Sequence, residues 1–98
     1  MILSKEQIQS TIAEFFADKP VNKVWLFGSY ARGDADEKSD VDVLVDLDFS
    51  KTIGLGYFSW HENLRELLNK DVHVVADGGI HKFIKPYVEK DKIIIYEK

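Results

Sequence analysis

The stretch that decides the fold is "KVWLFGSYARGDADEKSDVDVLV", which runs from Lys23 to Val45. Its first five residues, Lys23–Phe27, form a short apolar run with strand character. Its last six, Asp40–Val45, alternate at a period of two, which places the valines on one face of a strand. A Gly-Ser turn and an acidic loop lie between the two runs. The stretch therefore predicts two strands that flank an acidic loop.

Working outward, the chain before this stretch predicts one helix. Ser4 and Gln7 have the spacing of a capping box, and Leu3 with Ile8 fits a hydrophobic staple. An apolar stripe follows at helical spacing: Ile8, Ile12, Phe15 and Phe16.

The chain after the stretch predicts a helix over residues 57–68 that ends at Asn69, and a strand over 71–75. Helical spacing returns over residues 80–88, where Pro86 must kink the helix or begin a new turn. Residues 92–96 predict an edge strand guarded by its flanking lysines. This order predicts an α/β (α+β) fold, a mixed sheet of about four strands with helices packed against it.

Composition narrows the class of protein. We expect one domain over residues 1–98, because the chain is too short for a second core. Its 45% apolar and 31% charged residues indicate a globular protein rather than a disordered one. It has no cysteine, signal-peptide pattern or membrane-spanning run, so we expect it in the cytoplasm. A net charge of −4 argues against stable binding to duplex nucleic acid.

Three common motifs fail on this sequence. Gly28 and Gly33 have the glycine spacing of a P-loop, but Asp34 and Ala35 stand where Lys and Ser or Thr are needed. A calcium loop that began at Asp34 would lack its glycine and its final glutamate. The glycines of residues 54–56 do not form a dinucleotide-binding fingerprint.

The remaining pattern has a clear chemical use. A Gly-Ser turn that leads into a short helix exposes backbone N–H groups and a hydroxyl, which suit phosphate oxygens. Asp40 and Asp42 fall on one face of a strand, roughly 6.6 Å apart along it. Their carboxylates can converge on one or two Mg²⁺ ions, as in phosphoryl or nucleotidyl transfer. Bound cations would also offset the repulsion between the two carboxylates.

The compound pattern "GSYARGDADEKSDVDVLV" resembles the GSxARG…SDxD signature of the DNA polymerase β-like nucleotidyltransferases, and at this length the minimal members of that superfamily. The resemblance implies that Gly28 and Ser29 hold the β- and γ-phosphates of ATP and that Asp40 and Asp42 hold Mg²⁺. Arg32 and Ser39 complete the implied nucleotide-binding set. From the residues alone, Arg32 is equally well explained as a partner of Asp34 or Asp36.

The sequence departs from that family at one position. The resemblance implies a third carboxylate on the strand after the central helix, where it helps to activate the acceptor hydroxyl. The register that aligns the valines of "DVHVV" places His73 there. Three explanations stay open: Asp71 substitutes by a small shift in register, His73 acts as base or metal ligand, or the third site is lost.

The resemblance also implies a function. It predicts a Mg²⁺-dependent enzyme that transfers AMP from ATP to a hydroxyl of a partner protein. That partner would be a helical HEPN-type toxin, with a tyrosine as the acceptor, and this chain would be the antitoxin. The alternatives are an antitoxin that neutralises its partner by contact, with little or no catalysis, and a regulatory domain that binds nucleotide without turnover.

Overall fold

A computed structural model describes residues 2–78 and 82–98. Four strands form one mixed sheet in the order β3-β2-β1-β4. β1 pairs antiparallel with both β2 and β4, whereas β2 and β3 run parallel. The predicted mixed sheet of four strands is thereby confirmed, with β4 at an edge. In chain order the elements are α1 (Lys5–Phe16), β1 (Val21–Phe27), α2 (Ser29–Arg32), β2 (Val41–Leu47), the 3₁₀ helix η1 (Leu55–Ser59), α3 (Trp60–Leu68), β3 (Val72–Ala76), α4 (Lys85–Asp91) and β4 (Ile93–Glu97).

The predicted capping box begins α1. The Ser4 hydroxyl accepts a bond from the Gln7 N–H at 3.1 Å, and the Gln7 side chain accepts one from the Ser4 N–H at 2.9 Å. Two residues of the apolar stripe, Ile8 and Ile12, lie on successive turns of α1 and are fully buried. The same face ends at Phe16, whose ring packs edge-on against Trp60 of α3. This contact joins the two long helices into one layer.

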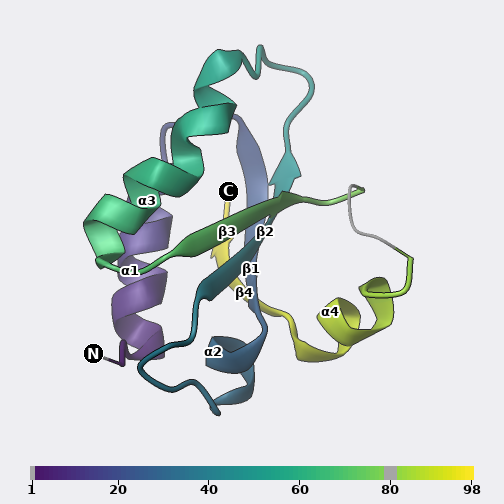
Figure 1. Cartoon of the computed structure of the whole chain (residues 1–98). Coiled ribbons are helices and arrows are strands. Elements are labelled where there is room, and N and C mark those ends of the chain that lie inside the picture. Colours follow the sequence, from purple (N-terminus) through teal and green to yellow (C-terminus); the bar gives the residue numbers. More distant parts are fainter. Residues whose placement is uncertain (1, 79–81) are drawn as a thin grey trace.

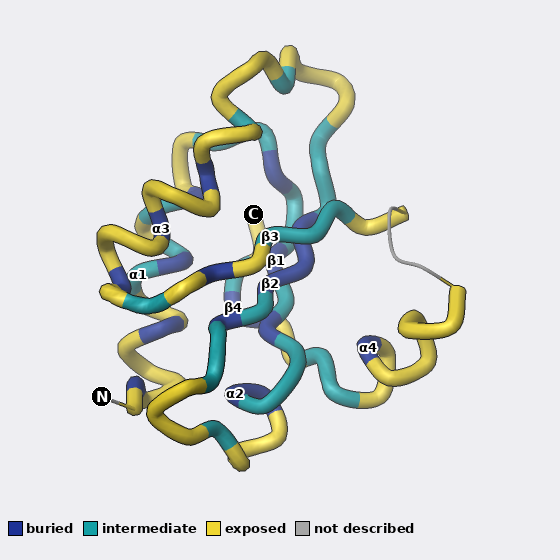
Figure 2. Tube along the Cα trace, in the orientation of Figure 1, coloured by how far each residue is buried: buried dark blue, intermediate teal, exposed yellow. Residues whose placement is uncertain are grey.

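Helices α1 and α3 cover one face of the sheet (Figure 1). Val41, Val43 and Val45 of β2 are fully buried and belong to the core cluster on that side. Because successive side chains on a strand point to opposite faces, Asp42 points away from this layer. Figure 2 shows how the buried segments gather between the helices and the sheet while the connecting loops are exposed. The alternation predicted from the sequence thus fixes which face of the sheet carries the acids.

Several predicted boundaries were wrong by one or more residues. β2 continues beyond Val45 to Leu47, because its end pairs with Val21 of β1. The helix expected over 57–68 is a 3₁₀ helix followed by α3, although Asn69 ends it in the left-handed conformation as predicted. β2 begins at Val41, so Asp40 lies just before the strand rather than on it.

The final helix resolves the question that Pro86 raised. α4 starts at Lys85 with Pro86 in its first turn, so the proline begins a helix rather than kinking one. Ile80, which the prediction included, lies outside the described residues. In the described part of the chain, every helix is too short or too polar to cross a bilayer.

Candidate functional site

The two predicted acids lie where β1 and β2 bring the Gly-Ser turn beside them. Phe27, the last residue of β1, pairs with Asp42 on β2. The chain turns at Gly28 immediately after that pair, so the turn and the Asp42 carboxylate are neighbours. Asp40 lies one residue before β2, with its side chain 41% exposed. Strand pairing therefore places the predicted phosphate-binding turn and the predicted metal ligands together.

Gly28 is required by this close approach. A Cβ atom built on it would lie 2.5 Å from the Asp42 Oδ2 atom. Its backbone, at φ 78° and ψ −156°, is in a region that is essentially restricted to glycine. Ser29 then begins α2, a four-residue helix. The use of Gly28 and Ser29 in phosphate binding stays a prediction that this geometry fits.

His73 lies beside the two predicted metal-binding acids. The parallel pairing of β2 with β3 sets Asp42 directly beside His73. The His73 Nδ1 atom lies 3.1 Å from Asp42 Oδ1, and the Nε2 atom lies 3.5 Å from Asp40 Oδ2. The contact between Nδ1 and Asp42 is within hydrogen-bond distance, and the tautomer of the ring decides which of the two atoms donates. His73 is thus within ligand distance of the pair.

Burial changes the acidity of one member of the pair. Burial raises the pKa of the Asp42 carboxyl above its ordinary value, and the neighbouring His73 opposes the rise only in part. A raised pKa means that folding disfavours the charged carboxylate. The contribution of Asp42 to stability is therefore lost as the pH rises through the folded-state pKa.

We therefore expect Asp42→Asn to be at least as stable as the parent protein at pH 7 in the presence of EDTA. Because a domain of this size gains about 4–8 °C per kcal/mol, thermal unfolding detects a small gain. The difference in melting temperature should shrink as the pH falls below the ordinary Asp range, where the parent's Asp42 is protonated. A variant that unfolds at lower temperature at pH 7 would contradict this assignment.

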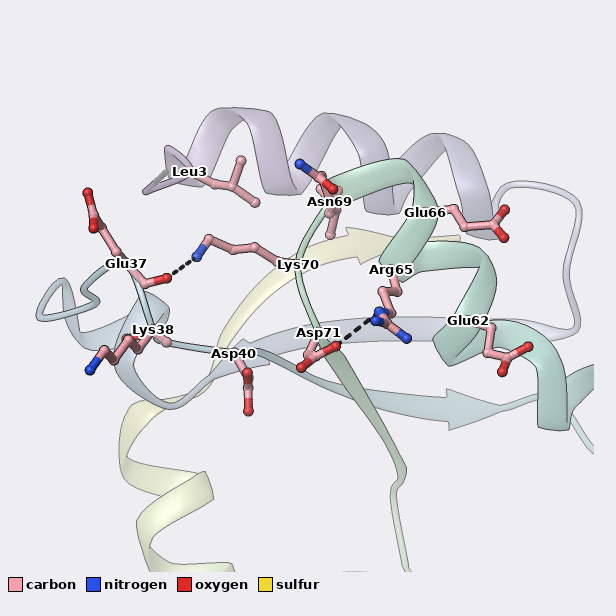
Figure 3. A pocket seen from close by; sticks show the side chains of 12 residues that line it. Leu3, Glu37, Lys38, Asp40, Glu62, Arg65, Glu66, Asn69, Lys70 and Asp71 are labelled. Atoms are coloured by element: carbon pink, nitrogen blue, oxygen red, sulfur yellow. Dashed lines mark hydrogen bonds and ion pairs between the residues drawn. The ribbon is translucent and has the colours of Figure 1, made fainter.

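Asp71 takes a different partner. Its carboxylate forms an ion pair with Arg65 of α3 at 3.1 Å, and both side chains are mostly exposed. Figure 3 shows this pair, with Asp40, at a polar cavity of about 680 Å³. The backbone oxygen of Asp71 also accepts a bond from the Val41 N–H. Of the two candidates for the third position, His73 is the one whose ring lies against the Asp40 and Asp42 side chains.

Arg32 is held by acids from two parts of the chain. It donates to Asp34 at 3.2 Å and to Asp91, at the end of α4, at 2.8 Å. Both bonds raise the pKa of Arg32 further above its high ordinary value, and the bond to Asp91 has the larger effect. The alternative of a pair with Asp34 is therefore observed, and the phosphate role stays a prediction. Sequence reasoning missed Asp91, because 59 residues separate it from Arg32 and no motif marks it.

Ser39 stabilises the acidic loop. Its hydroxyl accepts a bond from the Asp36 N–H at 2.8 Å and lies 3.3 Å from the Asp36 carboxylate. Its own N–H donates to the Asp36 backbone oxygen. These bonds shape the approach to Asp40, so Ser39 has a structural task whether or not it contacts nucleotide.

The donor set fits a magnesium ion in part. Asp40 and Asp42 supply the carboxylate oxygens that Mg²⁺ prefers, whereas an imidazole is better suited to transition metals. Within residues 2–78 and 82–98, no group of three or more His, Asp or Glu side chains has the arrangement of a metal site. The acid pair is therefore the candidate metal-binding element, and His73 is an unusual third member.

Known proteins resemble this chain over most of its length. The family model of the nucleotidyltransferase domain matches residues 9–96. The protein adenylyltransferase MntA of Thermococcus cleftensis is 31% identical over 98 residues, covering 96% of this chain and 98% of that protein.

Two solved structures share the fold. One is a chain of a toxin–antitoxin crystal structure with AMP-PNP (TM-score 0.76, 20% identity, 92% of this chain and 73% of that chain). The other is a chain from the structure of a tri-AMPylated Shewanella oneidensis HEPN toxin in complex with MNT antitoxin (TM-score 0.70, 18% identity, 95% of this chain and 72% of that chain).

Proposed function

Because this chain belongs to the nucleotidyltransferase domain family, we propose that it transfers the adenylyl group of ATP to a hydroxyl of a partner protein in a Mg²⁺-dependent reaction. The observation that supports this most strongly is the close approach of the Gly28 turn to Asp42, because it joins the predicted phosphate-binding turn to the carboxylate pair. Magnesium, when bound by Asp40 and Asp42, would compensate the charge of the phosphates.

The side chains have separable tasks in this reaction. Gly28 and Ser29 hold the β- and γ-phosphates through backbone N–H groups and the hydroxyl. The acceptor oxygen attacks the α-phosphorus, the bond from that phosphorus to the bridging oxygen breaks, and pyrophosphate leaves. The acceptor proton passes to His73 or to water, since His73 adjoins both acids. The acids would hold the cation that compensates the charge of the α-phosphate, and the turn restrains the leaving group.

We propose a HEPN-type toxin as the partner. The support is that a solved complex with this fold pairs an MNT antitoxin with a HEPN toxin that carries AMP groups, and that a full-length relative bears the name protein adenylyltransferase. The partner supplies the acceptor hydroxyl.

The test uses two labels on ATP. Incubation with Mg²⁺, ATP labelled at the α-phosphate and a HEPN-type protein from the same organism should label that protein. ATP labelled at the γ-phosphate should leave it unlabelled, because the γ-phosphate departs in pyrophosphate. Label from the γ-phosphate would show phosphoryl transfer instead and would overturn the proposal.

One observation favours a second candidate, an antitoxin that neutralises its partner by contact with weak catalysis or none. His73 lies against Asp40 and Asp42, so a metal ion must compete with this ring for the same carboxylates. This second function would be established if Asp42→Asn still inhibits the partner and neither the parent protein nor the variant transfers label to it.

The third position can be tested by restoring the acid. We expect His73→Asp to raise partner adenylylation about tenfold, a gain below the typical contribution of a positioned base, because a third carboxylate replaces a ring that competes with the cation for the pair. Asp71→Ala should change the rate less than about twofold, since Asp71 pairs with Arg65 on the exposed surface. The measurement is the initial rate at saturating ATP.

The opposite pattern is equally informative. A strong loss in Asp71→Ala would mean that Asp71 leaves Arg65 and acts at the reacting centre. If the parent protein transfers the adenylyl group rapidly and His73→Asp transfers it more slowly, the imidazole of His73 is the base.

A further inference from the structure

We propose that Asp91, the last residue of α4, is a positioning residue of the reaction: it holds the Arg32 guanidinium where it can bind a phosphate of ATP and keeps it off the Asp42 carboxylate. The inference rests on the proposed function, and it adds to the site a residue that no motif of the sequence marks. The Arg32 Nη1 atom donates to Asp91 Oδ2 at 2.8 Å, although 59 residues separate the two along the chain.

The sheet register brings Asp91 to the predicted phosphate-binding turn. β4 pairs antiparallel with β1, and Ile93 lies opposite Leu26. When this register is continued by two residues past the end of the pairing, Asp91 comes level with Gly28. On the other side of β1, the Gly28 backbone closely approaches the Asp42 carboxylate. The turn therefore has one acid on each side, from β2 and from the end of α4.

Arg32 lies between these two acids. It follows Gly28 by one helical turn, since its N–H donates to the Gly28 oxygen at 3.0 Å. Burial raises the pKa of the Asp42 carboxyl, and the positive charge of Arg32 is one of the smaller effects that act against this rise. A guanidinium forms strong, often bidentate bonds with carboxylates. An unrestrained Arg32 would therefore be drawn to Asp42, where it would compete with the cation for this carboxylate.

Two carboxylates hold the guanidinium by separate atoms. Asp91 accepts from Nη1, and Asp34 accepts from Nε at 3.2 Å. Among residues 2–78 and 82–98, Nη2 donates to no partner, so its two N–H groups are available to a phosphate oxygen. Because the guanidinium is planar and rigid, fixing two of its nitrogens also fixes the direction of the third. The two acids thus orient the side chain and leave one donor group free.

Asp91 is the less exposed of the two partners. Its side chain is 13% exposed, whereas that of Asp34 is 62% exposed. Exposed ion pairs contribute little, because water screens them. Asp91 also belongs to a packed element: Val88 of α4 is buried, and the Lys92 ammonium lies 4.7 Å from the centroid of the Trp25 ring. The position of Arg32 is therefore set mainly by Asp91.

Nucleotide binding tests this assignment without catalysis. The probe is a non-hydrolysable ATP analogue with Mg²⁺, titrated into the full chain in a calorimeter. Asp91→Ala should raise its dissociation constant at least about fivefold, because Arg32 then turns to Asp42. Asp34→Ala is the matched control: it removes the exposed partner of the same guanidinium and should stay within about twofold of the parent. Asp91→Glu, which keeps the carboxylate, should restore part of the affinity.

The opposite change in affinity has a different meaning. Tighter binding in Asp91→Ala would show that Asp91 withholds Arg32 from the phosphates, and it would overturn the proposal. Unchanged binding would overturn it as well. If the alanine variant does not fold in thermal unfolding, Asp91→Asn replaces it, since the amide keeps an oxygen acceptor and loses only the charge; its dissociation constant should rise at least about threefold.

A double-mutant cycle tests whether Asp91 acts through Arg32. In an Arg32→Gln background, adding Asp91→Ala should change the affinity for the analogue by less than about twofold. Equal losses in both backgrounds would mean that Asp91 only stabilises α4, and this result would overturn the proposal.

The transfer assay distinguishes failure of this inference from failure of the proposed function. Asp91→Ala should lower kcat/KM for ATP about tenfold. If the partner is adenylylated and Asp91→Ala leaves both kcat and KM for ATP unchanged, the enzyme is correctly identified and Asp91 has no part in its reaction. If the binding cycle gives the expected coupling but no label is ever transferred, the positioning of Arg32 stands and the proposed activity fails.

Discussion

Asp42→Asn should reduce adenylyl transfer by at least about a hundredfold, a loss on the scale of removing one essential charge-stabilising group. The amide removes one charged oxygen ligand and leaves the phosphates without full compensation. Asp40→Asn should act in the same direction. The measurement is the initial rate of α-phosphate label entering the partner, with thermal unfolding to show that each variant is folded.

Asp46→Asn is the matched control. Asp46 lies on the same face of β2 as Asp42, four residues further along the strand. Its neighbour on β1 is Lys23, whereas the neighbour of Asp42 is Phe27. It should keep the rate within about twofold, as expected of a surface substitution. Full activity in Asp42→Asn would remove the acid pair from the mechanism, and an equal loss in Asp46→Asn would show that general surface charge is responsible.

Gly28→Val should produce the second large loss, about a hundredfold in kcat/KM together with weaker ATP binding. The structure adds a cause that the turn alone did not reveal: a side chain at residue 28 meets the Asp42 carboxylate itself. The substitution therefore blocks the approach of phosphate to the backbone and displaces a predicted metal ligand. Calorimetric titration with a non-hydrolysable ATP analogue measures the first effect, and the transfer rate measures both.

Gly33→Val separates backbone strain from this collision. Gly33 also has a positive φ, of 87°, but a Cβ atom there would meet nothing within 4 Å. It should lose stability through strain of about 1–2 kcal/mol while ATP affinity stays near that of the parent. Unchanged nucleotide affinity in folded Gly28→Val would show that the phosphate-binding turn is misplaced.

The local features of this protein follow from its sequence. The Ser4–Gln7 capping box acts within four residues, and the alternation of β2 assigns its valines to the core whatever the strand pairs with. The Gly-Ser turn and the Asp40-x-Asp42 spacing likewise predicted a phosphate and metal site because each pattern is set by short-range geometry. Predicted element ends erred where pairing overrode propensity, as at Leu47 opposite Val21.

What only the tertiary structure decided is which side chains meet at the site. Asp71 lies just before β3 and His73 lies on it, and the sequence could not choose between these two residues for the third position. The parallel register sets His73 beside Asp42, and Arg65 of α3 holds Asp71 away in an ion pair. Asp91 reaches Arg32 across 59 residues, and η1 brings Phe58 to the edge of β3. Such contacts depend on how whole elements pack, because interaction energy falls with distance in space and is indifferent to separation along the chain.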